Sequence, residues 1–479
     1  MLKCKIKWFL VCMRIVAIIG VIVGLGIVSY NLLKLDILPV KYLLVGSIII
    51  IILILVLVYL LFIVKKALIQ VIGLFIAVLL ISFCCFFNKY LSNTYDFFKN
   101  ANKEYETISY SVLILNESPY ETLESLQNKS ISYLEDSYKV SIQKELNRKI
   151  NYTEKLMDFW ESISELFDKK VEAIILEESY LALAKEEIQD FDLKTKEIYT
   201  FEIQVKAHEE NSNVSMNITM EPFIFYISGI DQWGNVKSIR GRSDVNMLVI
   251  VNPKTNQILL VNTPRDYYVQ LDGTEGLKDK LTHAGIYGID KSIKTLENFY
   301  DIDISHYLRV NFDSVIKIID VIGGIDINSD KAFKPRNDSR YINKGWNHFD
   351  GKLALAYARE RYAYTTGDHH RGENQQQVIT AIIEKLTRSN VLISKYNTLL
   401  DSLNGSFQTD MSMEEITSFI KYQIDKMPSW KVESIAVTGI GDMQPTYSMG
   451  SKLKLYVMNP DMNSVKMAKE KIKEVLNAA

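Results

Sequence analysis

Arginine is concentrated in one short stretch of the sequence, YARERYAYTTGDHHRGENQQQVI at residues 357–379. Arg359, Arg361 and Arg371 lie within thirteen residues, together with Asp368, and three consecutive glutamines follow. A solvated helix face would carry lysine and glutamate, whereas the planar guanidinium of arginine binds phosphate or carboxylate through two parallel hydrogen bonds. The composition of this stretch therefore predicts a local site for an anion.

Charged residues also stand next to apolar, strand-like segments elsewhere in the sequence. Asp231 comes directly after PFIFYISGI. Arg242 and Asp244 stand just before MLVIV, and Arg265 follows QILLVN. Rigid scaffolds place their functional groups at such strand ends and loops. Arginine is preferred over lysine at these positions although lysine is common elsewhere, so we expect these segments to contribute to one site.

Several arginines accompanied by aspartates predict a particular chemistry. Mg²⁺ prefers one or two carboxylates together with phosphate oxygens and water. Phosphoryl transfer requires from the protein mainly positioning and neutralisation of charge. The inventory therefore favours a phosphate–Mg²⁺ site over the carboxylate pair that cleaves sugars.

Other chemistries lack their motifs. The sequence contains no G-x-x-x-x-G-K-[ST] loop, no H-E-x-x-H and no G-x-S-x-G. His369 and His370 are adjacent, and we interpret them as part of a polar loop and not as a metal pair. TGIG at 438–441 is interpreted as a turn. All four cysteines lie in the first 85 residues, which excludes disulfides and thiolate chemistry from the rest of the chain.

The first ninety residues predict three membrane helices, at 15–33, 42–64 and 67–88. These runs carry no formal charge, and each is about as long as the roughly 20 helical residues that cross a bilayer core. The basic residues of 1–14 favour a cytoplasmic tail. Three crossings then place residues 89–479 outside the cell, so we expect a multi-pass protein of the cell membrane with a large extracellular region.

The part after the spans divides into two α/β regions. We expect a juxtamembrane helical linker at 89–109, with a small accessory α/β domain at 110–215. Within it, SPYETLESLQ at 118–127 is interpreted as a helix. No cluster of titratable groups stands out there, so we expect a spacer or docking module. Residues 216–479 alternate strands and helices, including a hairpin at 247–266, and predict an α/β/α sandwich with a mixed sheet.

Five segments together resemble the LytR-CpsA-Psr family of bacterial cell-wall enzymes. The resemblance covers roughly residues 216–479, and the three spans with the intervening module resemble the capsule-type subgroup. The segments that carry it are GID at 229–231, RSD at 242–244, TPRD at 263–266, LTHAGIYG at 281–288 and the stretch from DGKLALAYARER to GDHHRGENQQQVI.

The resemblance implies an activity and its partners. Members transfer a glycopolymer, capsular polysaccharide or teichoic acid, from an undecaprenyl-pyrophosphate carrier to peptidoglycan and leave a phosphodiester link. It also implies Mg²⁺ as cofactor and is compatible with binding to other capsule-assembly proteins. The polyprenyl chain would need an apolar tunnel beside the arginines, for which 247–261 and 312–322 can supply walls.

The resemblance also implies roles for individual residues, with Asp231 and Asp244 as the aspartates associated with Mg²⁺. One departure is Asn374, where many members carry a further arginine. The implied catalytic set is Asp231, Asp244, Arg359, Asp368 and Arg371. The implied pyrophosphate-binding set is Arg242, Arg265, Arg359, Arg361, Arg371, Gln375 and Lys294.

Two other classes of function remain open at this stage. The chain could be a membrane-bound regulator or attenuator that binds a lipid-linked wall precursor without converting it. It could also be a polyprenyl-pyrophosphate phosphatase, with water replacing the sugar hydroxyl. Nucleic acid is excluded as a partner, because the net charge is −2 and residues 1–14 are too few for a DNA-reading domain.

Overall fold

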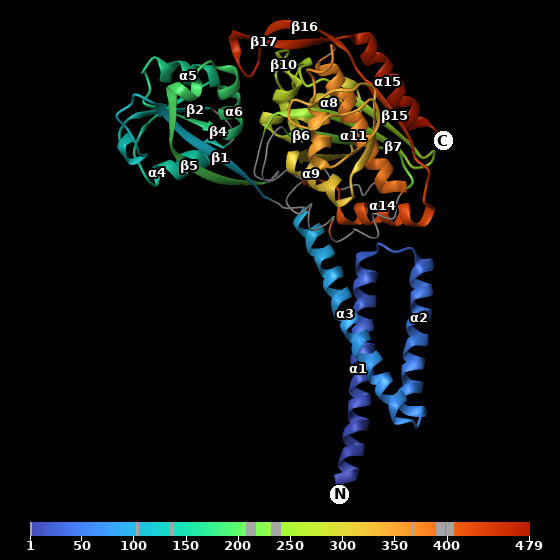
Figure 1. Cartoon of the computed structure of the whole chain (residues 1–479). Coiled ribbons are helices and arrows are strands. Elements are labelled where there is room, and N and C mark those ends of the chain that lie inside the picture. Colours follow the sequence, from blue (N-terminus) through green and yellow to red (C-terminus); the bar gives the residue numbers. More distant parts are fainter. Residues whose placement is uncertain are drawn as a thin grey trace.

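The computed structural model of the chain describes residues 2–101, 105–134, 138–206, 217–230, 241–365, 367–388, 398 and 407–479 (Figure 1). Along the chain it comprises a helical anchor, an accessory domain and a larger cavity domain. We use these three names for residues 2–101, 105–206 and 217–479, respectively.

The anchor consists of three long helices and one short π-helical turn. Three segments are long and apolar enough to cross a membrane, at Trp8–Leu35, Val40–Ile63 and Ala67–Tyr95, which confirms the predicted spans. Most of their side chains are exposed on the protein itself, which leaves an apolar surface for lipid to cover. The elements are α1 (Leu2–Leu35), α2 (Val40–Val58), η1 (Tyr59–Ile63) and α3 (Ala67–Ala101).

The third span and the juxtamembrane segment form one helix. We expected a helical linker at 89–109, and α3 continues as a helix to Ala101, whereas strand β1 already begins at Tyr105. Neither glycine nor proline occurs between 74 and 104, so nothing in the sequence interrupts the backbone hydrogen bonds of the helix.

The accessory domain is built on a five-stranded mixed sheet with the order β3-β2-β4-β1-β5. Successive residues of β1 point to opposite faces, so Val112 and Ile114 enter one apolar core and Leu113 enters another. The strands are β1 (Tyr105–Leu115), β2 (Ser130–Leu134), β3 (Thr153–Met157), β4 (Ala173–Glu177) and β5 (Thr195–Lys206). The helices are α4 (Lys139–Asn147), α5 (Phe159–Phe167), α6 (Glu178–Glu187) and α7 (Phe191–Lys194).

The helix predicted at 118–127 is wrong, because this segment forms turns and one short 3₁₀ helix, η2 (Glu124–Leu126). The hydroxyl of Ser125 donates to the carbonyl oxygen of Thr122, 2.6 Å away, and accepts from its N–H at 3.3 Å. Such local side-chain bonds to the backbone compete with helix formation. The turns still bury Leu123 and Leu126 in the domain core.

The cavity domain contains a six-stranded mixed sheet with the order β14-β11-β6-β7-β8-β15. The predicted hairpin is confirmed, since β7 and β8 pair antiparallel, while β11 pairs parallel with β6 and β15 parallel with β8. The strands are β6 (Phe223–Ile230), β7 (Ser243–Asn252), β8 (Gln257–Thr263), β11 (His306–Asn311), β14 (Phe407–Thr409) and β15 (Lys431–Ala436).

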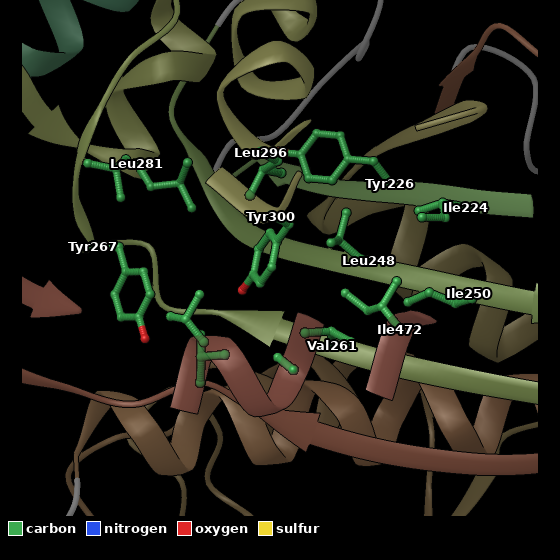
Figure 2. Packing of buried hydrophobic residues seen from close by; sticks show 14 of the residues in the cluster. Ile224, Tyr226, Leu248, Ile250, Val261, Tyr267, Leu281, Leu296, Tyr300 and Ile472 are labelled. Carbon is green, nitrogen blue, oxygen red and sulfur yellow. The ribbon is translucent and has the colours of Figure 1, made fainter. Parts of the chain in front are cut away.

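One face of this sheet packs against a helical layer in the largest apolar core. Tyr226, Leu248 and Ile250 point from the strands toward Tyr300 and Ile472 of the helices (Figure 2). This layer consists of η4 (Leu281–Tyr287), α8 (Ile289–Tyr300) and α15 (Met462–Asn477).

The opposite face is covered by a second helical layer, which confirms the predicted α/β/α sandwich. Met247 and Val249 alternate with the residues of the first core and pack in a cluster with Trp430 and Phe419. This layer consists of α9 (Phe312–Val321), α10 (Gly351–Ala358), α11 (Asp368–Arg388) and α14 (Met413–Lys426).

Three two-stranded ribbons complete the described part of the cavity domain. One of them corrects the turn expected at 438–441, because residues 439–441 belong to strand β16. The ribbons pair β9 (Tyr268–Gln270) with β10 (Lys278–Lys280), β12 (Ile325–Ser329) with β13 (Gly345–Phe349), and β16 (Gly439–Thr446) with β17 (Gly450–Pro460).

The cavity domain contacts the anchor through α14, which lies beside the loop between α1 and α2 (Figure 1). Two ion pairs of opposite polarity join them. Lys41 lies 2.8 Å from Asp425, and Asp36 lies 2.7 Å from Lys421. Met413, at the start of α14, packs against the apolar cluster of the anchor. The loop between the first two helices therefore faces the second helical layer.

Candidate functional site

A cavity of about 610 Å³ lies between the sheet and the second helical layer. Most of its wall is apolar. The apolar lining residues include Phe225 and Ile227 of β6, Val249 of β7, Leu308 and Val310 of β11, Phe312, Val315 and Ile318 of α9, Leu355 of α10, and Val378, Ile379, Ile382 and Ile383 of α11.

Arginines gather in the wall of the same cavity. The residues predicted for the anion site come from three segments that are distant in sequence, and the fold brings seven of them together here. These are Arg242, Asp244, Arg265, Arg359, Arg361, Arg371 and Gln375. With Arg336, the described lining carries six arginines and two carboxylates, so the cavity is strongly positive and suited to an anion with several charges.

The start of β7 aims two of these residues into the cavity. The hydroxyl of Ser243 is buried on the opposite face, 2.7 Å from that of Ser228 and 2.9 Å from that of Tyr226. The register between β6 and β7 shifts here, because Gly229 pairs with Val245 whereas Ile230 pairs with Ser243, so that Asp244 is an extra residue on β7. With this irregularity, both Arg242 and Asp244 line the cavity.

Asp244 is a buried carboxylate held by two donors. Arg265 donates to one oxygen at 2.8 Å, and the hydroxyl of Thr282 donates to the other at 2.9 Å. Burial alone would raise its pKa, but the charges of Arg265, Arg242 and Arg371 outweigh burial and lower the pKa of Asp244 to about 2. This carboxylate is therefore ionised at neutral pH, and it fixes the guanidinium of Arg265.

The turn after α10 gives the middle residue of the pattern Arg359-Glu360-Arg361 a different role from the two arginines. Glu360 is 3% exposed, and its carboxylate accepts from the N–H groups of Tyr362 and Ala363 at 2.6 and 3.0 Å. Its other oxygen accepts from the N–H of Arg336 at 2.8 Å. Glu360 is thus a buried organiser of the turn, while Arg359 and the second arginine of the pattern face the cavity.

Aromatic rings hold three of the arginines in place. The guanidinium of Arg359 lies 4.1 Å from the centre of the Phe312 ring. Arg336 and Arg361 lie 4.6 and 4.9 Å from the centre of the Tyr362 ring, and Arg361 also donates to the hydroxyl of Tyr362 at 2.8 Å. This hydrogen bond is the largest cause that lowers the pKa of Tyr362. Stacking of this kind restricts flexible side chains before a ligand arrives.

Helix α11 carries a continuous lining face. Its residues at spacings of three and four lie on one side of a helix. From the polar end to the apolar end, this face consists of Arg371, Gln375, Val378, Ile379, Ile382 and Ile383.

The neighbouring residues of α11 attach it to the rest of the domain. The amide of Gln376 donates to the carbonyl oxygens of Ile435 and Leu260 at 2.5 and 3.3 Å, and Gln377 accepts from Tyr357 at 2.9 Å. Of the three consecutive glutamines, Gln375 alone is among the lining residues of the cavity, because successive helical residues point about 100° apart.

Gly372 allows α11 to approach β8 closely. A Cβ atom at this position would lie 2.1 Å from the amide nitrogen of Asn262, which is far inside van der Waals contact.

The expectation for Lys294 is corrected. This lysine is exposed on α8, which covers the opposite face of the sheet from the cavity, and it is absent from the described lining. The helical phase of α8 is set by Ser292, Thr295 and Leu296, which are buried. Residue 294 consequently points to solvent.

The polar loop expected at His369 and His370 is also corrected, because α11 begins at Asp368 and includes both. His370 is buried, with Nδ1 2.8 Å from the Glu373 carboxylate and its ring stacked on Tyr364. The polar composition hid this helix. Some of the buried contacts of α11 are made by polar side chains. The amide of Asn374 donates to the carbonyl oxygen of Tyr357 at 3.1 Å. Asn374, where many family members carry an arginine, is therefore buried in the interior.

Two predicted catalytic residues are not placed. Asp231 lies outside the described residues, and so does the side chain of Asp368, although its backbone begins α11.

Of the two segments expected to supply apolar walls, only one lines the cavity over several residues. Residues 312–322 supply Phe312, Val315 and Ile318, but from 247–261 the cavity is lined by Val249 alone. The remaining inward residues of β7 and β8 pack in the two cores on either side of the sheet.

Sequence reasoning missed two charged lining residues. Arg336 lies between β12 and β13, and the preference for arginine over lysine that marked the other segments would have found it. Glu186 belongs to the accessory domain and forms an ion pair with Arg242. It stands in AKEEIQD, which reads as a solvated helix face, so no local signal marked it. The accessory domain is therefore more than a spacer, because it contributes to the wall of the cavity.

The donor set is compatible with Mg²⁺. The described residues contain no group of three or more His, Cys, Asp and Glu side chains that could hold a metal by themselves. Mg²⁺ requires one or two carboxylates when phosphate oxygens and water supply the rest. Asp244, which is ionised and lines the cavity among arginines, would supply one such ligand.

The cavity of this α/β domain joins clustered arginines to a long apolar wall, which suits a ligand with both an anionic and an apolar part. The chain is a member of the LytR_cpsA_psr family, whose model matches residues 190–470.

Named relatives match about half of the chain. A polyisoprenyl-teichoic acid–peptidoglycan teichoic acid transferase, TagU, of Enterococcus faecalis is 33% identical over 237 residues, which are 49% of this chain and 76% of that protein. The protein of the same name from Bacillus cereus is 36% identical over 197 residues, which are 41% of this chain and 62% of that protein. The crystal structure of B. subtilis TagV covers 54% of this chain and 98% of its own, with 30% identity and a TM-score of 0.44.

Proposed function

We propose that this protein transfers a glycopolymer, teichoic acid or capsular polysaccharide, from an undecaprenyl-pyrophosphate carrier to peptidoglycan. The single observation that carries the proposal is the cavity, which joins six arginines to a long apolar wall. The relatives named as teichoic acid transferases, and membership of their family, support it.

The cavity matches the two parts of such a donor. Guanidinium groups bind the pyrophosphate oxygens through charge-assisted, frequently bidentate hydrogen bonds. The apolar walls receive the first isoprenoid units, whose burial is favourable in proportion to the area removed from water. Phe225 and Ile383, at the apolar end, pack in the same cluster as Phe419 of α14. Since α14 contacts the anchor, the lipid chain would enter from the membrane side.

The reaction is a displacement at phosphorus. A hydroxyl oxygen of the acceptor attacks the phosphorus atom nearer the glycopolymer, a new P–O bond forms, and the bond from that phosphorus to the bridging oxygen breaks. Undecaprenyl phosphate leaves, and the hydroxyl proton passes to a base. Arginines that neutralise the developing charge contribute about 3 kcal/mol for each well-placed donor.

The carboxylates divide the remaining tasks. Asp244 has a pKa of about 2 and is bound to Arg265, so it stabilises the positive cluster and is a poor proton acceptor. Asp368, at the start of α11, is the carboxylate that the resemblance assigns near the reacting group. Mg²⁺, held by Asp244 and Asp231, would neutralise further phosphate charge.

The donor dictates the location of the site. A lipid-linked glycopolymer that is joined to peptidoglycan lies in the outer leaflet, so the accessory and cavity domains belong outside the cell. The three apolar helices keep the cavity beside the membrane that holds its substrate.

The proposal is tested with the full chain in detergent and a lipid-linked donor, with and without peptidoglycan. We expect polymer transfer that depends on acceptor, and a loss of about 100-fold in Arg371→Ala at an unchanged unfolding temperature. Arg148→Ala, which removes an exposed arginine of the accessory domain, serves as control. Wild-type transfer by Arg371→Ala would contradict the assigned site. Phosphate release without transfer would indicate a phosphatase, and binding without product a regulator.

A further inference from the structure

The accessory domain places one carboxylate in the arginine cluster. Glu186, near the end of α6, lines the cavity and forms an ion pair with Arg242. The side chain of Arg242 is 18% exposed and that of Glu186 is 47% exposed, so the carboxylate covers the guanidinium from the solvent side. Among the described lining residues, Glu186 is the one that does not belong to the cavity domain.

An apolar interface holds α6 in this position. The ring of Tyr180 on α6 packs edge-on against Tyr287, with ring centres 6.2 Å apart. The surrounding core is continuous across the two domains, since it contains Leu181 of α6 together with Ile286 and Met449 of the cavity domain. Glu186 is therefore presented by a packed helix and not by a loose surface segment.

The same interface leads directly to the arginine cluster through η4. Tyr287 ends η4, while Thr282, near its beginning, donates to Asp244. Between them, a Cβ atom on Gly285 would lie 2.5 Å from the carbonyl oxygen of Gly241, so η4 packs tightly against the segment that carries Arg242. A continuous series of packing contacts therefore connects α6 with the segment that carries Arg242.

Each edge of the Arg242 guanidinium can donate hydrogen bonds to one anion at a time. The planar fork that pairs with a carboxylate is the one that pairs with a phosphate. Burial lowers the pKa of Arg242, whereas Glu186 and Asp244 raise it above its ordinary value, so the guanidinium remains charged and neutralised by protein carboxylates. A phosphate that binds Arg242 must displace Glu186 or share the guanidinium with it.

We propose that Glu186 controls the affinity of this cavity for phosphate: it competes with the donor phosphate for Arg242, and the accessory domain thereby sets the affinity of the pyrophosphate site. The inference rests on the proposed function, because it takes a pyrophosphate as the ligand of the arginines. A weakened site favours release of the product, which keeps one phosphate fewer than the donor.

The test measures binding of inorganic pyrophosphate to the full chain in detergent by calorimetry. Glu186→Gln keeps the shape of the side chain and removes its charge. We expect about three- to fivefold tighter binding, the size of a partly exposed ion pair. Glu187→Gln is the matched control, because it removes the same charge from the next residue of α6, which is not among the lining residues. It should bind as wild type does.

A second comparison separates competition from a general charge effect. In an Arg242→Gln background, the added Glu186→Gln substitution should change pyrophosphate affinity by less than about 1.5-fold, because its partner is gone. Unchanged or weaker binding by Glu186→Gln alone would overturn the inference while leaving the proposed function intact. An equal gain from Glu187→Gln would also overturn it. If neither wild type nor Glu186→Gln binds pyrophosphate, both proposals fail.

Discussion

Asp244→Asn is the most informative single substitution, because the carboxylate of Asp244 is buried and compensates several arginines. Its pKa is about 2 in the folded protein against an ordinary value of 3.8. A difference of that size corresponds to about 2 kcal/mol of stability for the ionised form. The amide of asparagine preserves the shape but not the charge. We therefore expect the variant to lose about 2 kcal/mol of unfolding free energy at neutral pH.

The stabilisation by Asp244 should decrease as the pH falls. Because the folded-state pKa is depressed, the contribution of Asp244 is fully present above about pH 4 and disappears as the pH falls from 3.8 toward 2. Wild type should lose this stability on acidification, whereas Asp244→Asn has none of it to lose. The two stability curves should accordingly converge at the acid end.

The assay is chemical denaturation of the full chain at several pH values, followed by tryptophan fluorescence, to which the buried Trp430 contributes. Asp303→Asn, at an exposed position, is the control and should follow wild type at every pH. A difference between wild type and Asp244→Asn that stays constant down to pH 2 would refute the reasoning. It would show that the charge of this carboxylate does not stabilise the fold.

Two further perturbations test the packing of the cavity wall and its attachment to the membrane. Gly372→Ala would place a methyl group against the side-chain amide of Asn262, and we expect a loss of about 1–3 kcal/mol in thermal unfolding with reduced transfer. An unchanged melting temperature would show that the Asn262 side chain moves aside without cost. Lys421→Asp should increase hydrogen exchange in α14 by opposing Asp36, and the exchanged pair Asp36→Lys with Lys421→Asp should restore it. Equal exchange in the single and double variants would show that this ion pair does not dock the domain.

Several features followed from local sequence because they depend on residue type and short-range periodicity. The three spans were predictable from uncharged runs of sufficient length, and the helices in the structure confirm them. Two apolar runs joined by the turn NPKTN predicted the hairpin of β7 and β8, and the mixed α/β/α architecture is confirmed. The preference for arginine indicated an anion site, since guanidinium geometry suits phosphate whatever the fold.

Where local reasoning was wrong, the direction of a side chain or a competing interaction decided the outcome. Lys294 points to solvent because its buried neighbours fix the rotation of α8. The segment 118–127 has helical residues, but side-chain bonds such as that of Ser125 favour turns.

The sequence by itself determined the chemistry available to this protein: a membrane anchor, two α/β regions and an arginine-rich inventory fit for phosphate. Tertiary structure decided which of these residues share one cavity. Strand order brings Arg242, Arg265 and Arg371 together, and packing of α6 on η4 adds Glu186 from another domain. These contacts join residues that are far apart in the sequence. They depend on how whole elements pack against one another, which no local pattern of residues determines.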